Sequence, residues 1–232
     1  MKEYIKKTLL CIVPLLFAGS VLFANDIYVT QSGDTLDLDI TQDGQNNTVG
    51  NSTTASSSTG ATTTLNIDQI GNSNVITYQI NGATYTGTIN LVGNSNNVDL
   101  NCDSTGNNSS CGTANAVINF TGNSNDIDLD IGQTSSATSA DVDIVGQSGS
   151  DSNVVAATVD GNSAILTITV NGDTNNWLVD IDGNGDINGH TLIHTHTGGI
   201  ADVDIVQSGV NDQMITLTTS GDNHDIDIQQ TD

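Results

Sequence analysis

The chain alternates apolar and polar residues in many short runs. In "LNIDQIGNSNVITYQI", residues 65–80, two such runs flank a turn-forming sequence that begins at Gly71. Alternate residues of a β-strand share one face, so the pattern predicts two short strands joined by a tight turn. Gln69 and Asn74 have the same parity as the apolar residues of their own runs. Both amides are therefore expected to point inward.

This strand-turn-strand unit recurs along the chain. Superposition on the turn glycine gives further copies at Gly44, Gly93, Gly122, Gly172, Gly209 and Gly221, and a copy with a longer turn, "DVDIVGQSGSDSNVVAATV". Two residues before the glycine, some copies have glutamine and others have an apolar residue, namely Leu91, Phe120 or Val170. A position that accepts both kinds indicates an inward site.

A single unit of this size cannot bury its apolar face alone, so the copies must stack. The sequence predicts an all-β fold: one β-solenoid domain over residues 25–232, with about 7–8 stacked strand-turn-strand coils and parallel sheets. Three polar insertions each follow a second strand, and we expect them to leave from one edge of the stack. They are "VGNSTTASSSTGATTT", "NCDSTGNNSSCG" and "GQTSSATSAD".

Stacking gives the inward amides hydrogen-bond partners. A lone buried amide costs roughly 1–3 kcal/mol, but an identical amide about 4.8 Å above or below it can form a ladder along the axis. We predict such a ladder for Gln42, Gln69 and Gln207. For the asparagines, a ladder and the preference of asparagine for left-handed turns are both open. The asparagines concerned are Asn47, Asn74, Asn96, Asn125, Asn153 and Asn175.

Residues 1–24 have the features of a secretory signal peptide. Lysines precede an apolar run from Leu9 to Phe17, and Ala24 is the expected last residue of the segment. The remaining chain is predicted to be secreted and extracellular. No later stretch is apolar enough to span a bilayer.

The charge of the remaining chain excludes one function class. All 3 Lys and Arg residues and the only Glu lie in residues 1–24, so residues 25–232 keep 26 acidic residues (27 minus 1), all Asp. Nucleic-acid binding needs cations that neutralise phosphates and is excluded, while attraction to an anionic membrane is disfavoured. Repeated "DLDI", "DVDI" and "DIDI" would stack carboxylates about 5 Å apart, at a cost on the order of 1 kcal/mol per pair. We therefore hypothesise that stability and assembly depend on cations or ionic strength.

The signature Gln-x-Gly-x-x-Asn, in residues 42–47 and 69–74, resembles the curlin repeat of curli fibre subunits; residues 207–212 are a near match. The resemblance implies a β-solenoid whose subunits add end to end into extracellular amyloid fibres of a biofilm matrix. It also implies a nucleator and an outer-membrane secretion pore as partners. The second glutamine of the family repeat is out of register here, because Gln79 is displaced by one residue.

Two clusters suggest metal ligands. "DIDGNGDINGHT" matches the first part of a calcium loop through Asp180, Asp182, Asn184 and Asp186, since calcium prefers oxygen ligands; the alternative is an ordinary turn. His190, His194 and His196 lie close together, and a transition-metal site competes with a solvated strand or loop, which we favour. The turn position of His224 indicates a structural role, and Trp177 replaces a core residue.

Cys102 and Cys111 are the two cysteines of residues 25–232. In an exported protein an even number of cysteines indicates a disulfide, with two free or buried thiols as the alternative.

No motif indicates catalysis, so we interpret the chain as a non-enzymatic structural subunit. A monomeric, cation-stabilised solenoid that binds a surface, sugar or ice is the alternative. Threonine pairs such as Thr62 and Thr64 suit an ice face, but the sequence does not place them at one repeat position. A polysaccharide lyase is a third reading, and it would need basic residues in its groove.

Overall fold

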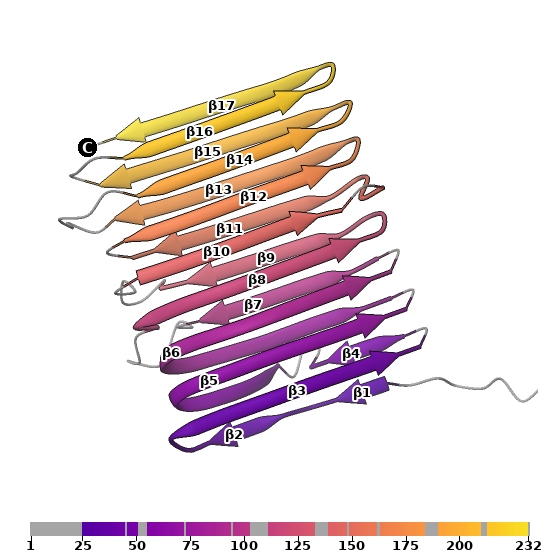
Figure 1. Ribbon diagram of the computed structural model, residues 1–232, viewed down its shortest axis with the longest axis vertical. Coiled ribbons are helices and arrows are strands. Elements are labelled where there is room, and N and C mark those ends of the chain that lie inside the picture. The colour runs from indigo at the N-terminus through magenta and orange to yellow at the C-terminus, as the bar shows by residue number, and fades with distance from the viewer. Residues whose placement is uncertain are drawn as a thin grey trace, which may run out of the picture.

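The computed structural model describes residues 25–44, 46–50, 55–71, 73–93, 95–102, 111–132, 139–147, 149–161, 163–183, 190–209 and 213–231 (Figure 1). Within these ranges the structure is all-β, and every strand pairing is parallel. Each coil lies on the next along one axis, so the predicted β-solenoid is confirmed. No helix long and apolar enough to cross a membrane occurs in this part of the chain.

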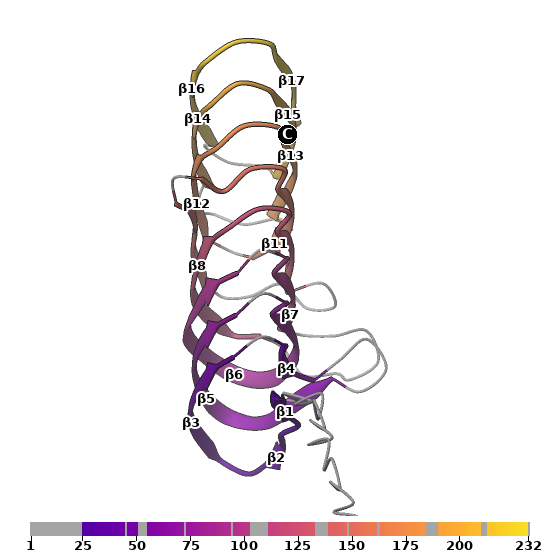
Figure 2. The ribbon, with the colours of Figure 1, turned by 90° about the vertical axis from the view of Figure 1, so that its right-hand side faces the viewer.

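Two sheets face each other across the core (Figure 2). The first sheet consists of β3 (Thr35–Asp43), β5 (Ser56–Ile70), β6 (Val75–Val92), β8 (Thr113–Thr121), β10 (Ser139–Gly146), β12 (Ala164–Asn171), β14 (Thr191–Thr197) and β16 (Met214–Ser220). The second sheet consists of β1 (Asn25–Ile27), β2 (Thr30–Ser32), β4 (Asn47–Val49), β7 (Asn97–Cys102), β9 (Asp126–Ile131), β11 (Val154–Asp160), β13 (Asn175–Gly183), β15 (Ala201–Gly209) and β17 (His224–Thr231).

Strands β5 and β6 run through both sheets, and their first halves belong to the second sheet. They bend where Gly60 pairs with Gly82. A Cβ on Gly82 would lie 2.3 Å from the Gly60 carbonyl oxygen, so only glycine lets the coils approach at this corner.

The first predicted insertion is wrong in part, because residues 56–64 belong to β5. Their small hydroxyl side chains alternate between inside and outside. Ser56, Ser58 and Thr63 are buried, and the Ser58 and Thr63 hydroxyls lie within hydrogen-bond distance of each other at 3.1 Å. The other two insertions lie largely outside the described residues, although β7 and β9, the strands that precede them, both belong to the second sheet.

The core consists of columns of equivalent residues, one from each coil. On the first sheet a single inward position is isoleucine in six successive strands: Ile40, Ile67, Ile89, Ile118, Ile144 and Ile168. Burial of one such side chain contributes about 1.5–3 kcal/mol. Trp177 takes the corresponding aliphatic position on the second sheet between Val155 and Val203, and it is buried, as predicted.

Candidate functional site

The turn motif fixes the close approach of the coils. The turn glycines form a column. A Cβ on Gly71, Gly93, Gly198 or Gly221 would meet the carbonyl of the turn glycine on the neighbouring coil, and a Cβ on Gly172 would meet the Ser150 carbonyl. A Cβ on Gly71 would lie 1.9 Å from the Gly44 oxygen, and one on Gly93 would lie 2.1 Å from the Gly71 oxygen. Real Cβ atoms do not approach oxygen this closely. The glycine of the signature is therefore a stacking requirement as well as a turn residue.

The predicted asparagines form a buried column on the second sheet, at the first inward position after each turn. In the later coils one amide hydrogen closes the local turn, as from Asn175 Nδ2 to the Gly172 oxygen at 2.7 Å. The other donates along the axis. Asn96 donates to Asn125 at 2.5 Å, Asn125 to Asn153 at 2.6 Å, and Asn153 to Asn175 at 2.7 Å. An amide has two donor hydrogens, so each of these asparagines both bonds its own turn and takes part in the ladder, which confirms the ladder for the later coils.

Asn47 and Asn74 do not donate to each other. Asn47 Nδ2 instead bonds the Gln42 and Ile70 carbonyls at 3.0 and 2.9 Å, and so ties two coils together through the backbone. The left-handed residue of the later turns is not the asparagine but the residue before it, for example Ser124 with φ 59° and Thr174 with φ 59°. The alternative explanation, a left-handed conformation of the asparagine itself, is therefore wrong for these turns, because the left-handed residue is the one before it.

Gln42 and Gln69 form the expected amide contact. They are directly paired inward residues of β3 and β5, and Gln69 Nε2 donates to Gln42 Oε1 at 2.5 Å. Leu91 and Phe120 continue this column in β6 and β8. The amide ladder therefore ends at Leu91, and within the described residues the buried Gln69 Oε1 has no hydrogen-bond partner.

The placement of Gln207 in this ladder is wrong. Gln207 lies in β15 on the second sheet, between Ile181 and Gln230, and Gln230 Nε2 donates to its Oε1 at 3.3 Å. Gly209 accordingly lies at the opposite edge of the stack from Gly71. The turn of this coil that corresponds to Gly71 joins β14 to β15 at Gly198, and the superposition of the repeats missed it. Ala201 takes the asparagine position in this coil.

His190, His194 and His196 are buried, so the expectation that they lie in a solvated strand or loop is wrong. His194 occupies the isoleucine column between Ile168 and Leu217, and His196 occupies the glutamine column. His190 Nδ1 accepts a hydrogen bond from the backbone N–H of Ala164 at 3.2 Å. Alternation within β14 could have predicted this burial, because Leu192 has the same parity as the three histidines.

Burial keeps two of these rings neutral. Within the described residues, neither nitrogen of His194 has a hydrogen-bond partner, and the ring packs edge-on against Trp177 with centroids 5.1 Å apart. Burial, helped by His196, lowers the pKa of His194 to about 4. The pKa of His196 is also lowered, chiefly by burial and further by His224, against the Gly172 carbonyl and Asp173, which raise it.

The His196 ring reaches from the glutamine column to the end of the asparagine column, where it contacts Asn175. Its Nε2 lies 2.8 Å from Asn175 Nδ2 and 3.0 Å from the Gly172 oxygen. In one neutral tautomer Nε2 accepts from the Asn175 amide, and in the other its N–H donates to the Gly172 carbonyl. Its ring also packs edge-on against His224, with centroids 5.2 Å apart. His224 occupies the turn-asparagine position, one coil beyond Ala201.

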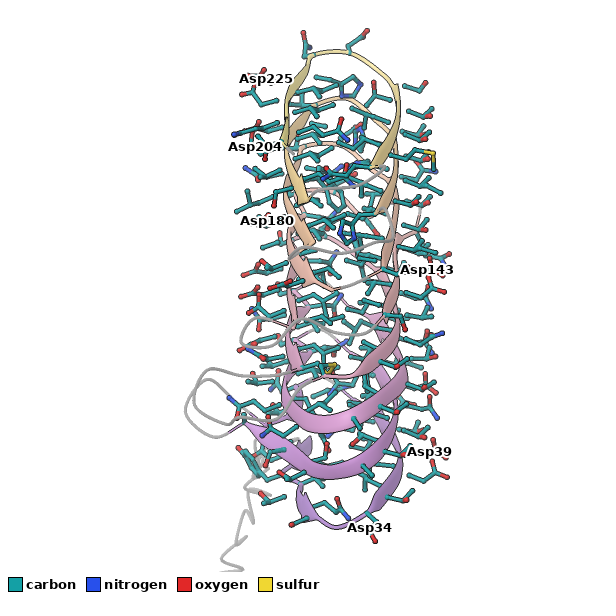
Figure 3. The ribbon with its side chains drawn as sticks, turned by 90° about the vertical axis from the view of Figure 1, so that its left-hand side faces the viewer. Asp34, Asp39, Asp143, Asp180, Asp204 and Asp225 are labelled. Carbon is teal, nitrogen blue, oxygen red and sulfur yellow. A yellow bond between two sulfur atoms is a disulfide. The ribbon has the colours of Figure 1, made fainter. Side chains whose placement is uncertain are left out.

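The aspartates point away from both sheets (Figure 3). Asp180, Asp204 and Asp225 lie on one side of the stack, and Asp39 and Asp143 on the other. Many have an amide rather than a carboxylate above or below them. Asn66 Nδ2, for example, donates to Asp39 Oδ1 at 2.8 Å. The expected rows of stacked carboxylates are therefore interrupted, and amide donors reduce the repulsion between coils.

Within the described residues, aspartates pair directly in neighbouring strands at four positions, which are Asp99 with Asp128, Asp160 with Asp182, Asp202 with Asp225 and Asp204 with Asp227. Partial burial, followed by Asp130, Asp99 and Asp126, raises the pKa of Asp128 to about 6. Burial also raises the pKa of Asp99. Any effect of cations on stability is expected to be largest here.

The predicted calcium loop lies mostly outside the described residues, which exclude Asn184 and Asp186. Asp180 and Asp182 belong to strand β13 and pair with Val206 and Ser208, so a loop conformation at its start is wrong. The described part of the chain contains no group of three or more His, Cys, Asp or Glu residues placed to hold a metal ion. Calcium binding remains a prediction.

The threonine pairs recur more regularly than the sequence suggested. Thr62 and Thr64 of β5 pair directly with Thr84 and Thr86 of β6, so the expectation that such pairs do not share a repeat position is wrong for these two coils.

Cys102 and Cys111 form a disulfide with Cα atoms 5.5 Å apart, between the end of β7 and the residues before β8. The bond closes a loop with a sequence separation of 9. Loop-closure entropy predicts that the variant with both cysteines changed to alanine loses about 2–3 kcal/mol of unfolding free energy. Guanidinium unfolding of both proteins measures this loss. Equal midpoints, with and without reductant, would contradict it.

Both ends of the described stack have unpaired strand edges. At one end β16 and β17 pair only with β14 and β15, and at the other β1, β2 and β3 pair only with β4 and β5. Four inward apolar side chains at these ends are only partly buried, namely Ile27, Leu38, Ile215 and Ile226, whereas Ile40 of β3 is buried. Within the described residues no strand or helix covers either edge.

Comparisons with protein-family models, curated proteins and solved structures found no match to this chain.

Proposed function

We propose that this protein is a secreted structural subunit that polymerises end to end into curli-like extracellular amyloid fibres, for adhesion and as biofilm matrix. The observation that supports this most is the pair of open stack ends. A row of unpaired backbone groups is a template for another strand, and soluble repeat proteins normally cover it with polar caps.

The side chains at the ends support the same proposal. Ile228 points along an inward column of the last coil, yet it is 48% exposed because no coil follows it. Parallel strand pairing could continue from one copy to the next, because the coils inside the molecule already pair in this way. The partner is therefore a second copy of this chain, with a nucleator and an outer-membrane secretion pore proposed from the resemblance to curlin repeats. No cofactor is needed, and calcium would act by screening carboxylates.

Ile228→Asp is expected to abolish fibre growth while leaving the monomer folded. The side chain is half exposed at the stack end, so the monomer loses little, but each junction would bury a carboxylate without a partner. Val92→Asp is the matched control, since Val92 is 47% exposed on the side of the stack. Electron micrographs and a meridional reflection near 4.7–4.8 Å measure fibre formation by residues 25–232.

Fibres of equal yield from Ile228→Asp and the unchanged protein would contradict growth through this end. If the unchanged protein remains monomeric at every salt concentration and pH tested, the alternative is favoured: a monomeric, cation-stabilised solenoid that binds a surface, sugar or ice. The aligned threonines of β5 and β6 are the feature that this alternative would use.

A further inference from the structure

The stack contains a half-integral number of coils. Its first strands, β1 and β2, and its last strand, β17, all belong to the second sheet, so this sheet has one more layer than the first. If a second copy were added without rotation, β1 and β2 would lie on β17. The first sheet would then lack a strand between β16 of one copy and β3 of the next, and both edges would remain unpaired.

Resting on the proposed end-to-end growth, we infer that successive subunits are related by a half-turn about the fibre axis. Rotation by 180° exchanges the two sheets of the second copy. Its β1 and β2 then lie on β16, and its β3 lies on β17. Strands in the two sheets run in opposite directions along the coil, so the half-turn also restores parallel pairing. Both sheets continue through the junction with no missing strand.

The coil has the symmetry that this junction needs. Each complete coil contributes four inward positions from each sheet, as in β8 with Ala114, Ala116, Ile118 and Phe120, and in the turn and β9 with Asn125, Ile127, Leu129 and Ile131. A strand of the second sheet therefore fits over a strand of the first, because their inward side chains have the same number and spacing.

The side chains at the two ends match in this arrangement. On one side Ile215 and Leu217 of β16 meet Ile27 and Val29 of the next copy. On the other side the matched inward pairs are Ile226 with Leu38, Ile228 with Ile40, and Gln230 with Gln42. The last pair places amide on amide and so continues the type of ladder that Gln69 and Gln42 form inside the molecule.

The same register explains why assembly would respond to salt. On the outer face Asp225 and Asp227 of one copy lie over Asp37 and Asp39 of the next. These two carboxylate pairs repel at low ionic strength, so screening ions or protonation should accelerate fibre growth. The repulsion opposes the junction but leaves no backbone group unpaired, whereas the unrotated arrangement leaves two strand edges unpaired.

Cysteine cross-linking separates the two arrangements, because Thr30 faces different residues in each. With the half-turn, Thr30 of one copy lies beside Thr218 of its neighbour; without it, Thr30 lies beside Gln229. All three side chains are exposed. Disulfides require Cα atoms within about 7 Å. Residues that face each other on neighbouring strands meet this limit, because such strands lie about 4.8 Å apart. Fibres of Thr30→Cys/Thr218→Cys are therefore expected to give on the order of tenfold more covalent oligomers than fibres of Thr30→Cys/Gln229→Cys.

Each outcome decides between the two proposals. Preferential cross-linking through Gln229→Cys, or equal cross-linking in both variants, would overturn the half-turn and leave end-to-end growth intact. Absence of fibres from all variants and from the unchanged protein would overturn both. Thr30→Cys alone is the control, since it should give no covalent species larger than a dimer.

Discussion

Gly93→Ala is expected to destabilise the solenoid by about 3 kcal/mol. The new methyl group would lie 2.1 Å from the Gly71 carbonyl oxygen and 3.0 Å from Asn96 Oδ1. The first of these is a backbone atom in the middle of a stack of coils, so it cannot rotate away. The two coils must separate or tilt, which lengthens the hydrogen bonds between them and loosens the amides packed beside the turn. Guanidinium unfolding of the monomer measures the loss.

Gly199→Ala is the matched control, because the nearest atoms to its new methyl group belong to the Asp173 side chain, 3.1 Å away at Oδ1. A side chain can move, so we expect a loss below about 1 kcal/mol. If the two variants unfold at the same denaturant concentration, contact between turn glycines does not set the coil spacing. A selective loss at Gly93 would instead explain why the repeat signature contains glycine where the turn alone would accept asparagine.

The parity of apolar residues was sufficient to predict the fold. Alternation placed Gln69 and Asn74 inside, and repetition required coils to stack, so the β-solenoid followed from residue types alone. The sequence could not show which amide bonds form. Asn47 and Asn96 occupy equivalent positions, but Asn47 donates to backbone carbonyls and Asn96 to the next asparagine. That choice depends on small differences in turn geometry between coils.

The errors in register have one cause. A glycine follows strands at both edges of the stack, and the sequence comparison could not tell the edge of Gly71 from that of Gly209. It therefore placed Gln207 in the wrong sheet and missed the turn at Gly198. A half-integral number of coils, on which the half-turn between subunits depends, emerges only when each strand is assigned to its sheet.

The histidines show a different limit. His194 and His196 were predicted to be solvated because histidine is polar, although their parity with Leu192 indicated the core. Here packing outweighs polarity: the ring of His194 fills a position that is isoleucine in six other coils, at the cost of two nitrogens without partners in the described structure. Such a residue contributes to stability only while it stays neutral, which makes the last coils sensitive to acid.

The terminal coils are expected to open as the pH falls from about 6.5 to 4. Folding lowers the pKa of His194 from its usual value of 6.5 to about 4, so the unfolded chain binds a proton in this interval and the folded chain does not. The stability is therefore complete above pH 6.5 and is lost as the pH falls towards 4. Linkage gives a loss on the order of 3 kcal/mol. His196 adds to it in the same direction.

The surroundings of the two rings determine how this loss should be measured. His194 faces Trp177, Ile168, Leu217 and His196, with no carboxylate among these neighbours to stabilise a charged ring. Asp128 acts in the opposite direction, because its raised pKa means that acid relieves repulsion in the middle of the stack, but it is partly exposed and its effect is smaller.

Amide hydrogen exchange separates the two effects, because in a stack of repeats the end coils can open alone. Between pH 6.5 and 4.5, after correction for intrinsic exchange, protection should fall in β14 to β17 and persist in β6 and β8. The variant His194→Ile/His196→Gln places residues that the same columns already accept, and it should keep its terminal protection. If this variant and the unchanged protein lose protection equally, the buried histidines do not control the opening.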